Sequence, residues 1–307
     1  MCIVNCALIF TFSIFNYITY FTFSILTPLK HLTLGKGKRA YLCSHLIGVF
    51  NFQLNKVNIK AYLDEHAERI NKPSFIDDDP VKFPRRYKEL RDIEIVSFLV
   101  ATIAWGKRSM ILRDAERMLT KTGNSPYDYV MSEGYEKLGT SNVHRTFFEN
   151  DMAYMLRGFR HFYSLYDSMD SYMSTCAEHT PQKLVEALRV SAIEANGGTH
   201  NMKCYSKDFK NTALKRVNLA LRWLVRNDGI VDLGVWKSMN PSELYIPLDV
   251  HVGNTSREIG LLTRNNNDWK AACELTEKLR SYNPEDPVIY DFALFGIGVE
   301  KSKQSMK

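Results

Sequence analysis

Cysteines are few in this chain, and those beyond residue 6 stand far apart. The sequence has six, and the last four are Cys43, Cys176, Cys204 and Cys273. Zinc modules, iron–sulfur clusters and small disulfide frameworks all need cysteines at short, repeated spacings. The spacing therefore excludes these three kinds of site. It favours reduced thiols in a cytoplasmic protein that needs no metal or other cofactor.

Acidic residues are absent from the first part of the chain. Residues 1–29 carry no charged side chain, and residues 1–56 carry five basic residues and no acidic one. The formal net charge of +6 arises mostly there, because the 40 basic and 34 acidic residues of the whole chain become 35 and 34 over residues 57–307. The overall charge therefore gives no argument for a nucleic-acid partner, which must come from local clustering.

The hydrophobic extension of residues 1–56 leaves several interpretations open. The apolar run at residues 7–26 is long enough to span a bilayer, and the basic residues after it would keep the body in the cytoplasm. A signal peptide fits poorly, because no basic residue precedes the run and no small-residue cleavage site is evident. A translation start set too far upstream, with Val57 as the alternative start, is slightly favoured over a membrane anchor.

The body, residues 57–307, has the periodicity of helices. Apolar side chains recur at every third or fourth position, as along residues 93–103. Residues that cap helix starts are Asp92, Ser125 with Pro126, Thr180 with Pro181, Asp249 and Asp268. No hairpin turn flanked by alternating strands is evident. The sequence thus predicts an all-α body of roughly ten or more short helices, with loops at residues 196–211 and 227–248.

The segment most informative about chemistry is residues 212–262. It begins with a predicted helix at residues 212–226 that carries Lys215, and an apolar run leads from the following loop to Asp249. Aspartate before a helix is most often an ordinary N-cap. The apolar residues before Asp249 favour a functional carboxylate, because a dry wall tunes the pKa of a carboxyl group for acid–base work. A lysine among other cations has a lowered pKa, which favours an amine nucleophile.

Basic residues concentrate just before and within that predicted helix. Seven of the eight charged residues between positions 203 and 226 are basic, and Asp208 is the exception. A local charge of about +6 suits phosphate binding, although a solvated helix face is the commoner meaning of such a run.

The same segment resembles the helix–hairpin–helix DNA glycosylase superfamily. The run Leu248-Asp249-Val250-His251-Val252, followed by a helix that ends near Gly-Leu, is similar to the motif that carries the superfamily's essential aspartate. In bifunctional members a lysine upstream attacks the sugar carbon C1′, and Lys215 is the best match. The separation of 34 residues between Lys215 and Asp249 is similar to the archaeal 8-oxoguanine DNA glycosylase branch. The chain resembles most an uncharacterised, mainly bacterial group related to that branch.

The resemblance extends more weakly over residues 57–300. Residues 98–119 are similar to an early helix pair that carries a wedge residue into DNA, with Trp105-Gly106-Lys107-Arg108 in place of the usual glutamine. The resemblance implies a two-lobed helix–hairpin–helix glycosylase fold and a base-excision repair glycosylase, with or without AP-lyase activity. The implied partner is double-stranded DNA that contains a damaged, oxidised purine. We further expect a monomer in the cytoplasm, associated with the nucleoid, with a membrane contact only if residues 1–29 are native.

The site residues follow from this resemblance and from the basic cluster. Lys215 and Asp249 would be catalytic, and Trp105 and Trp236 are candidates for stacking on a flipped base, although a core tryptophan is the commoner role. The candidate DNA-binding residues are Lys107, Arg108, Lys207, Lys210, Thr212, Arg216 and Arg222. If Lys215 and Asp249 act on one sugar carbon, their side-chain ends face one cleft, about 4–8 Å apart.

The chain departs from the superfamily at the hairpin. The usual glycine-rich phosphate clamp is absent from residues 206–214, just before Lys215. Such glycines let backbone N–H groups approach a phosphate. Their loss shifts phosphate binding to Lys207, Lys210 and Thr212, or favours a non-catalytic DNA-binding protein of the same fold. The acidic run at residues 77–79 lacks the later ligands of a calcium loop and is interpreted as a solvated turn.

Overall fold

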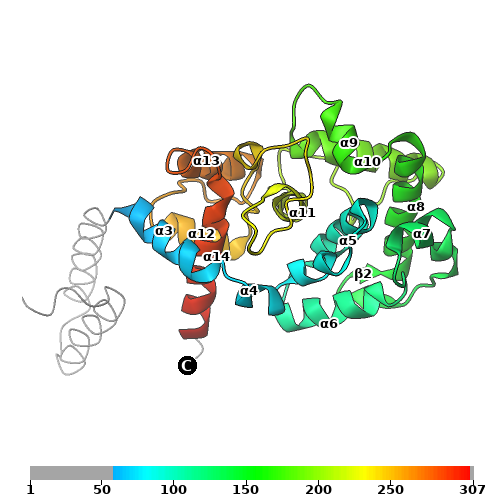
Figure 1. Cartoon of the computed structure of the whole chain (residues 1–307), viewed down its shortest axis with the longest axis horizontal. Helices are drawn as coiled ribbons and strands as arrows, with labels where there is room; N and C mark the ends of the chain where they lie inside the picture. Colours follow the sequence, from blue (N-terminus) through cyan, green and yellow to red (C-terminus); the bar gives the residue numbers. More distant parts are fainter. Residues whose placement is uncertain (1–57, 305–307) are drawn as a thin grey trace, which may run out of the picture. The chain divides into compact units, whose positions relative to one another are not determined.

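The computed structural model describes residues 58–304, and the side chains of residues 1–57 and 301–307 lie outside that description. The expectations for residues 1–56 therefore fall outside the described residues. The described part is mainly helical (Figure 1), which confirms the all-α prediction. Within it, none of the helices combines the length and apolar character that crossing a bilayer requires.

The helices follow one another along the chain, and the longest connections between them lie before and after α11. The α-helices are α3 Ile59–Ile70, α4 Ser74–Asp77, α5 Leu90–Ile103, α6 Arg108–Leu119, α7 Pro126–Met131, α8 Glu149–Leu165, α9 Met169–Ser174, α10 Pro181–Ala195, α11 Lys215–Val225, α12 Val250–Glu258, α13 Trp269–Arg280 and α14 Tyr290–Gln304. The 3-10 helices are η1 Pro80–Lys82, η2 Pro84–Arg86, η3 Gly134–Lys137, η4 Pro241–Glu243 and η5 Pro287–Ile289. The predicted loops at 196–211 and 227–248 contain no α-helix. The second of them contains the 3-10 helix η4.

Side-chain caps begin several helices at the residues that the sequence predicted. The caps that accept a hydrogen bond from a backbone N–H in the first turn are Ser125, Thr180, Asp249 and Asp268. The prediction for Asp92 is wrong, because α5 begins at Leu90 with Glu89 at its N-cap. The buried Asp92 carboxylate instead accepts a hydrogen bond from the backbone N–H of Tyr127 at 2.7 Å. It therefore caps the start of α7, a neighbour in space that sequence spacing cannot show.

A short hairpin interrupts the helices. Strands β1 (Asn142–His144) and β2 (Phe147–Phe148) pair in antiparallel orientation, and the described residues contain no other strand. The turn between them includes Arg145 with a left-handed φ of 51°. The sequence did not predict this hairpin, because the strands are too short to show alternation and the turn has no glycine, asparagine or aspartate to announce it.

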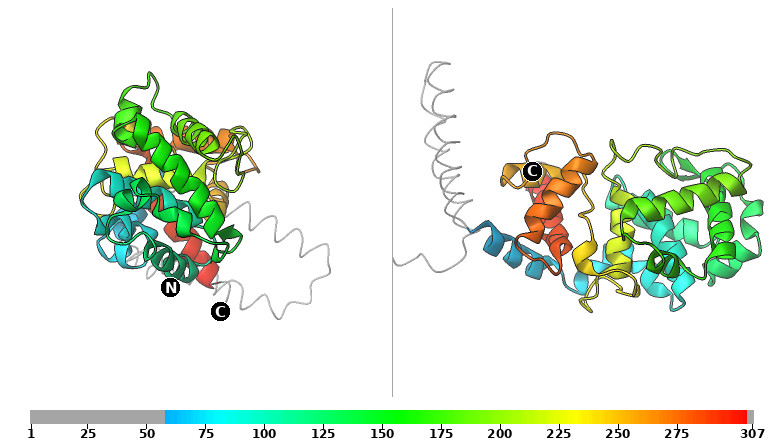
Figure 2. Two further views of the ribbon diagram at one scale, coloured as in Figure 1. Left: turned by 90° about the vertical axis from the view of Figure 1, so that its right-hand side faces the viewer. Right: turned by 90° about the horizontal axis from the view of Figure 1, so that it is seen from above.

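Two groups of buried apolar residues form the interior. The larger one gathers α5 to α11, and the smaller one gathers α3, α12, α13 and residues 246–248. Figure 1 and the right-hand view of Figure 2 show α11 on the side of the larger group that is turned toward α12 and α14. Helix α14 contributes to both, with Phe292 in the larger group and Leu294 in the smaller. Residues at the start of α11 therefore lie where the two interiors meet.

Candidate functional site

The start of α11 is where the two buried groups are joined. Ala213 belongs to the smaller group and Leu214 to the larger one, so consecutive residues are held in different interiors. Leu214 is the N-cap of α11 and has φ 50° and ψ 32°, a left-handed conformation that is costly for a branched side chain. Its burial keeps it there, because only 6% of the residue is exposed. Strained backbone of this kind fixes the direction of the next residue, Lys215.

The amine of Lys215 is held within the protein and does not extend into solvent. Its Nζ atom donates a hydrogen bond to the carbonyl oxygen of Ala104 at 2.6 Å. Ala104 ends α5 and begins the turn that contains Trp105. Burial lowers the pKa of Lys215, and the carboxylates of Asp249, Asp291 and Asp79 oppose that shift. A larger fraction of neutral amine than an exposed lysine would have is the chemical consequence.

Asp249 acts on the same amine from another segment. It is the N-cap of α12, and its Oδ1 atom accepts a hydrogen bond from the backbone N–H of Val252 at 2.9 Å. Its carbonyl oxygen accepts a hydrogen bond from Asn267 Nδ2 at 3.0 Å, which ties the start of α12 to the loop before α13. The fold thus brings Lys215 and Asp249 within electrostatic reach across 34 residues of chain. Within residues 58–304 the two make no direct ion pair.

Two further carboxylates near Lys215 escaped the sequence analysis. Asp79 is 7% exposed and accepts from Arg108 at 3.3 Å, so the interpretation of residues 77–79 as a solvated turn is wrong for Asp79. Asp291, in the first turn of α14, pairs with Arg222. Asp79 and Asp291 therefore each form an ion pair with an arginine. Asp249 is the remaining carboxylate around Lys215, and no described cation is ion-paired with it.

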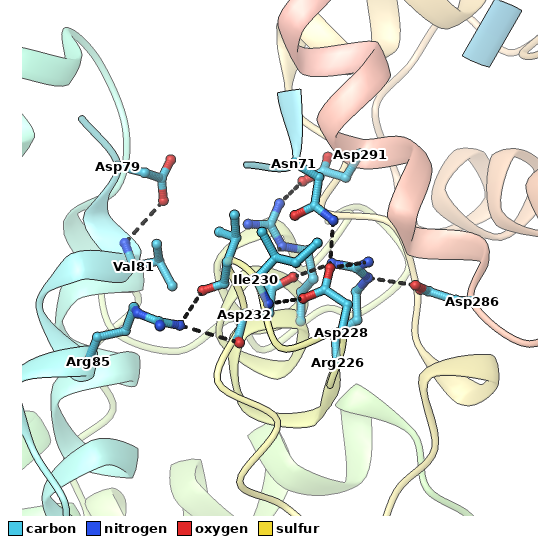
Figure 3. Close-up of polar contacts among 12 residues, drawn as sticks. Asn71, Asp79, Val81, Arg85, Arg226, Asp228, Ile230, Asp232, Asp286 and Asp291 are labelled. Atoms are coloured by element: carbon cyan, nitrogen blue, oxygen red, sulfur yellow. Dashed lines mark hydrogen bonds and ion pairs between the residues drawn. The ribbon is translucent and has the colours of Figure 1, made fainter. Parts of the chain in front are cut away.

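A buried ion-pair network lies behind Lys215 on α11. Arg222 forms ion pairs with both Asp291 and Asp232. Arg226 forms an ion pair with Asp232 at 2.8 Å. Arg226 also pairs with Asp228 at 2.8 Å and with Asp286 at 2.7 Å. Figure 3 shows this network closing around the labelled Arg226. Both guanidinium groups are almost completely buried, at 3% exposure for Arg222 and 1% for Arg226.

The prediction that Arg222 binds DNA is wrong for this structure. The periodicity of α11 placed Arg222 opposite its apolar stripe, which suggested a solvated face. The fold covers that face with the loop after α11 and with α14, and their aspartates neutralise both arginines. The local charge of the 203–226 segment at the surface is correspondingly smaller than its sequence suggests.

The remaining basic candidates have different surroundings. Lys207 and Lys210 are exposed, and Thr212 is half-buried with its Oγ1 atom accepting from the backbone N–H of Leu214 at 3.2 Å. Arg216 donates from Nη1 to the carbonyl oxygen of Lys203 at 2.9 Å, and burial lowers its pKa. Lys207 and Lys210 are thus the free cations of this group in the described residues.

The turn after α5 carries the other predicted residues. Lys107 is exposed at the N-cap of α6, whereas Arg108 is held by Asp79 and lies 4.8 Å from the ring centre of Phe295. Trp105 is half-buried, and the guanidinium of Arg145 lies 4.5 Å from its ring centre. Its indole face is therefore partly accessible, but it is covered by a cation.

His144 fixes the backbone of this turn. It is fully buried, and its Nε2 atom lies 2.8 Å from the carbonyl oxygen of Trp105 while Nδ1 lies 2.7 Å from Asp114 Oδ2. Both partners accept hydrogen bonds, so the imidazole donates to the carbonyl oxygen through Nε2 and to the Asp114 carboxylate through Nδ1. His144 therefore links the β1–β2 hairpin to the turn that contacts Lys215.

Trp236 is not available for stacking on a base. It is 3% exposed and packs in the larger buried group, and its Nε1–H has no hydrogen-bond partner among the described residues. The prediction for Trp236 is therefore wrong, and the commoner core role holds. The physical reason is that the loop at 227–248 folds back on α11, as the hydrogen bond from Trp236 N to Leu224 O at 2.9 Å shows.

The described residues contain no cluster of side chains that could bind a metal ion. Among residues 58–304, no group of three or more histidines, cysteines, aspartates and glutamates is arranged to hold a metal ion. The aspartates around Lys215 already have partners. Asp79 and Asp291 pair with arginines, and Asp249 accepts a hydrogen bond from the backbone at the start of α12.

Comparison with known proteins places most of the body in one family. Residues 79–300 match the family described as "Protein of unknown function (DUF2400)", and this covers more than half of the chain. The chain therefore belongs to the DUF2400 family, whose span includes Asp79, Lys215, Asp249 and Asp291. No curated protein and no solved structure matches the chain.

Proposed function

We propose that this member of the DUF2400 family is a DNA glycosylase with AP-lyase activity that removes an oxidised purine from double-stranded DNA. The proposal takes Lys215 as the nucleophile and Asp249 as its carboxylate partner. One observation carries it: a partly buried lysine amine with a lowered pKa lies within electrostatic reach of the Asp249 carboxylate, which is not ion-paired with any described cation.

The chemistry that this pair supports is covalent catalysis. The neutral Lys215 amine attacks C1′ of the damaged nucleotide, an N–C1′ bond forms, and the bond from C1′ to the base breaks with its electron pair leaving on the base. The departing base takes a proton from water. Asp249 accepts the proton that the attacking nitrogen loses and returns it to O4′ when the sugar ring opens. Opening of the sugar ring then gives an iminium ion between Lys215 and C1′. While positive charge develops at the sugar, the Asp249 carboxylate stabilises it.

The fold we propose for this activity is the two-lobed helix–hairpin–helix glycosylase fold. Its support is the order of the parts: a lysine at the first position of α11, a long loop, and an aspartate that begins α12. The lysine lies where two buried groups of helices meet, which is a common place for a ligand site.

DNA contacts would come from the exposed residues beside these two groups. Lys207, Lys210 and Lys107 are exposed, and the turn with Lys107 is the one that Lys215 contacts through Ala104. Trp105 is the aromatic candidate, and a base that stacks on it would first displace Arg145. Arg222 and Trp236 take no part in this proposal because both are buried.

Borohydride trapping tests the proposal. Purified protein is incubated with duplexes that contain 8-oxoguanine, uracil or an abasic site, and sodium borohydride reduces the iminium ion to a stable amine. We expect a covalent complex with the wild type and none with Lys215→Gln. Asp249→Asn should slow its formation by a factor of about 100 or more. Lys210→Gln is the matched control, because it removes an exposed lysine of the same segment and should weaken binding while trapping persists. Wild type that behaves like Lys215→Gln on every duplex would sink the lyase assignment.

A non-catalytic DNA-binding protein of the same fold is the second candidate. It is favoured by the missing glycines before Lys215, since Ala213 and Leu214 carry side chains where a phosphate would need close approach to the backbone. Salt-dependent binding to duplex DNA without base release, and without a trapped complex, would support this candidate. An absence of binding at low salt would count against both.

A further inference from the structure

Lys215 and Arg222 lie on one face of α11. They are seven residues apart, which is two helical turns and about 10 Å along the axis. The Arg222 guanidinium is turned away from solvent and fixed by Asp291, with side-chain exposures of 4% and 7%. A carboxylate held by Arg222 therefore stays beside the face of α11 that begins with Lys215.

Helix α14 presents Asp291 toward the same place from another direction. One turn after Asp291, the ring of Phe295 lies 6.4 Å from the ring of His251 and 4.8 Å from the Arg108 guanidinium. His251 is two residues after Asp249, and Arg108 is four residues after Ala104. The face of α14 that carries Asp291 is thus turned toward both segments that surround the Lys215 amine.

The fully buried part of the network is balanced on its own. Arg222 and Arg226 meet the buried carboxylates of Asp232 and Asp291, whereas the side chains of Asp228 and Asp286 remain 19% and 23% exposed. A buried carboxylate keeps its charge only where cations or hydrogen-bond donors surround it. On the α11 face next to Asp291, the nearest cation beyond these two arginines is Lys215.

We propose that Asp291 is a positioning residue which, fixed by Arg222, controls the protonation of the Lys215 amine. This inference rests on the proposed function, in which Lys215 is the nucleophile. Asp291 itself touches neither the base nor the sugar in this assignment. The other charged groups that face Lys215 are Asp249 from α12, Asp79 from the segment before η1, and Arg216 from α11 itself.

Asp291 and Lys215 influence each other's pKa, as their placement leads one to expect. Asp291 opposes the lowering of the Lys215 pKa that burial causes, and Lys215 opposes the raising of the Asp291 pKa. Burial raises the pKa of Asp291 to about 6, with Arg222 opposing and Asp249 reinforcing the shift. Asp286 belongs to the same network, but its partner is Arg226, which lies eleven residues after Lys215, about 16 Å farther along the helix axis. The network therefore offers a matched control at Asp286.

The pH dependence of borohydride trapping on abasic DNA separates positioning from stability. Asp291→Asn removes a negative charge beside the ammonium form of Lys215, so its pKa falls and neutral amine persists at lower pH. The acidic limb of the trapping rate should move to lower pH by about one unit. Asp286→Asn removes a carboxylate from the same network and should leave the limb in place, and Asp291→Glu, which keeps the charge, should restore the wild-type limb. An unchanged limb in Asp291→Asn, or an equal shift in Asp286→Asn, would overturn the proposal.

A second measurement needs no enzymatic activity. Lysines of the whole chain are reductively methylated with ¹³C, and the Lys215 resonance is identified by its loss in Lys215→Gln. We expect a lower Lys215 pKa in Asp291→Asn than in wild type and no change in Asp286→Asn. If trapping fails on every DNA while this shift is present, the proposed function falls and the Asp291–Lys215 coupling stands.

The wild-type protein itself provides the test if Asp291→Asn does not fold. The Lys215 resonance should then show a second inflection near pH 6, where Asp291 titrates, and that inflection should persist in Asp249→Asn. A single inflection in the wild type would overturn the proposal.

Discussion

The Nζ atom of Lys215 donates a hydrogen bond to the carbonyl oxygen of Ala104 at 2.6 Å. The bond connects the first residue of α11 with the turn that ends α5, across 111 residues of chain. An ammonium group and a neutral amine can both donate this bond. The carbonyl oxygen therefore keeps the nitrogen in place in either protonation state, while the charge of the amine is decided by the surrounding carboxylates.

Removal of the Arg222 guanidinium should destabilise the whole body. Arg222→Met leaves Asp232 and Asp291 buried without this partner, and the loss of one partner of a buried pair costs about 3–5 kcal/mol. Urea denaturation at pH 7 measures the free energy of unfolding. Lys60→Met is the control, since its pair with Asp64 at 2.7 Å is exposed and contributes less than about 1 kcal/mol. Equal losses in the two variants would contradict the importance given to the network.

Glu94 should make the stability depend on pH. It is fully buried on α5, and burial raises its pKa to about 7, against hydrogen bonds from Met169 N, Asp170 N and the Tyr163 hydroxyl. The folded state then holds the proton more tightly than the unfolded state, whose glutamate has a pKa of about 4.5. The free energy of unfolding should therefore fall as pH rises from about 4.5 to about 7, by up to about 3 kcal/mol from this group.

Urea denaturation at pH 5 and pH 8 measures this dependence. Glu94→Gln should reduce the difference between the two pH values, whatever its effect on stability at either one. Glu136→Gln should leave it unchanged, because the hydrogen bond from Arg157 lowers the pKa of Glu136 and moves its contribution below this pH range. The idea fails if Glu94→Gln keeps the wild-type difference.

The left-handed backbone at Leu214 should reverse the usual order of alanine and glycine. Both Leu214→Ala and Leu214→Gly lose the same buried side chain, but only glycine adopts a φ of 50° without strain. We expect Leu214→Gly to be the more stable of the two by about 1 kcal/mol. At Glu186, an exposed position within α10, alanine should be more stable than glycine by about 0.5–1 kcal/mol. Thermal unfolding of the four variants measures both differences, and the same order at both sites would contradict the prediction.

Exposed lysines before α11 should set the salt dependence of DNA binding. Replacing Lys207 and Lys210 together by glutamine should reduce the slope of log K against log salt by about 2, because each phosphate contact contributes about 0.9. The measurement is the affinity for duplex DNA at several salt concentrations. Lys137→Gln, at an exposed position on η3, is the control and should leave the slope unchanged. A wild-type slope in the double variant would remove these lysines from the DNA surface.

Local patterns predicted several elements because the forces that form them are local. Ser125, Thr180, Asp249 and Asp268 begin helices through hydrogen bonds within one turn, so a few residues suffice to announce them. Asp92 shows the limit of this reasoning. It has the residue type of a cap, but its partner is the backbone of Tyr127, 35 residues away.

The same limit applies to the candidate site. Lys215 and Asp249 could be chosen from residue type, position and resemblance, and the structure places them within electrostatic reach. Asp79 and Asp291 could not be chosen, because each looks like an ordinary surface aspartate until Arg108 and Arg222 are placed beside it. Periodicity identified the face of α11 that carries Arg222, but it could not show what covers that face.

The sequence by itself determined the helical body, four of the helix starts, and the chemical types available to the site, since period, capping and side-chain chemistry are properties of short segments. The tertiary structure alone decided which charges are buried and which carboxylates surround Lys215. Burial and ion pairing depend on contacts between residues that are distant in the chain, such as Arg222 with Asp291 across 69 residues. Burial lowers the pKa of Lys215 against the opposing carboxylates, and Asp249 is left without a paired cation among the described residues.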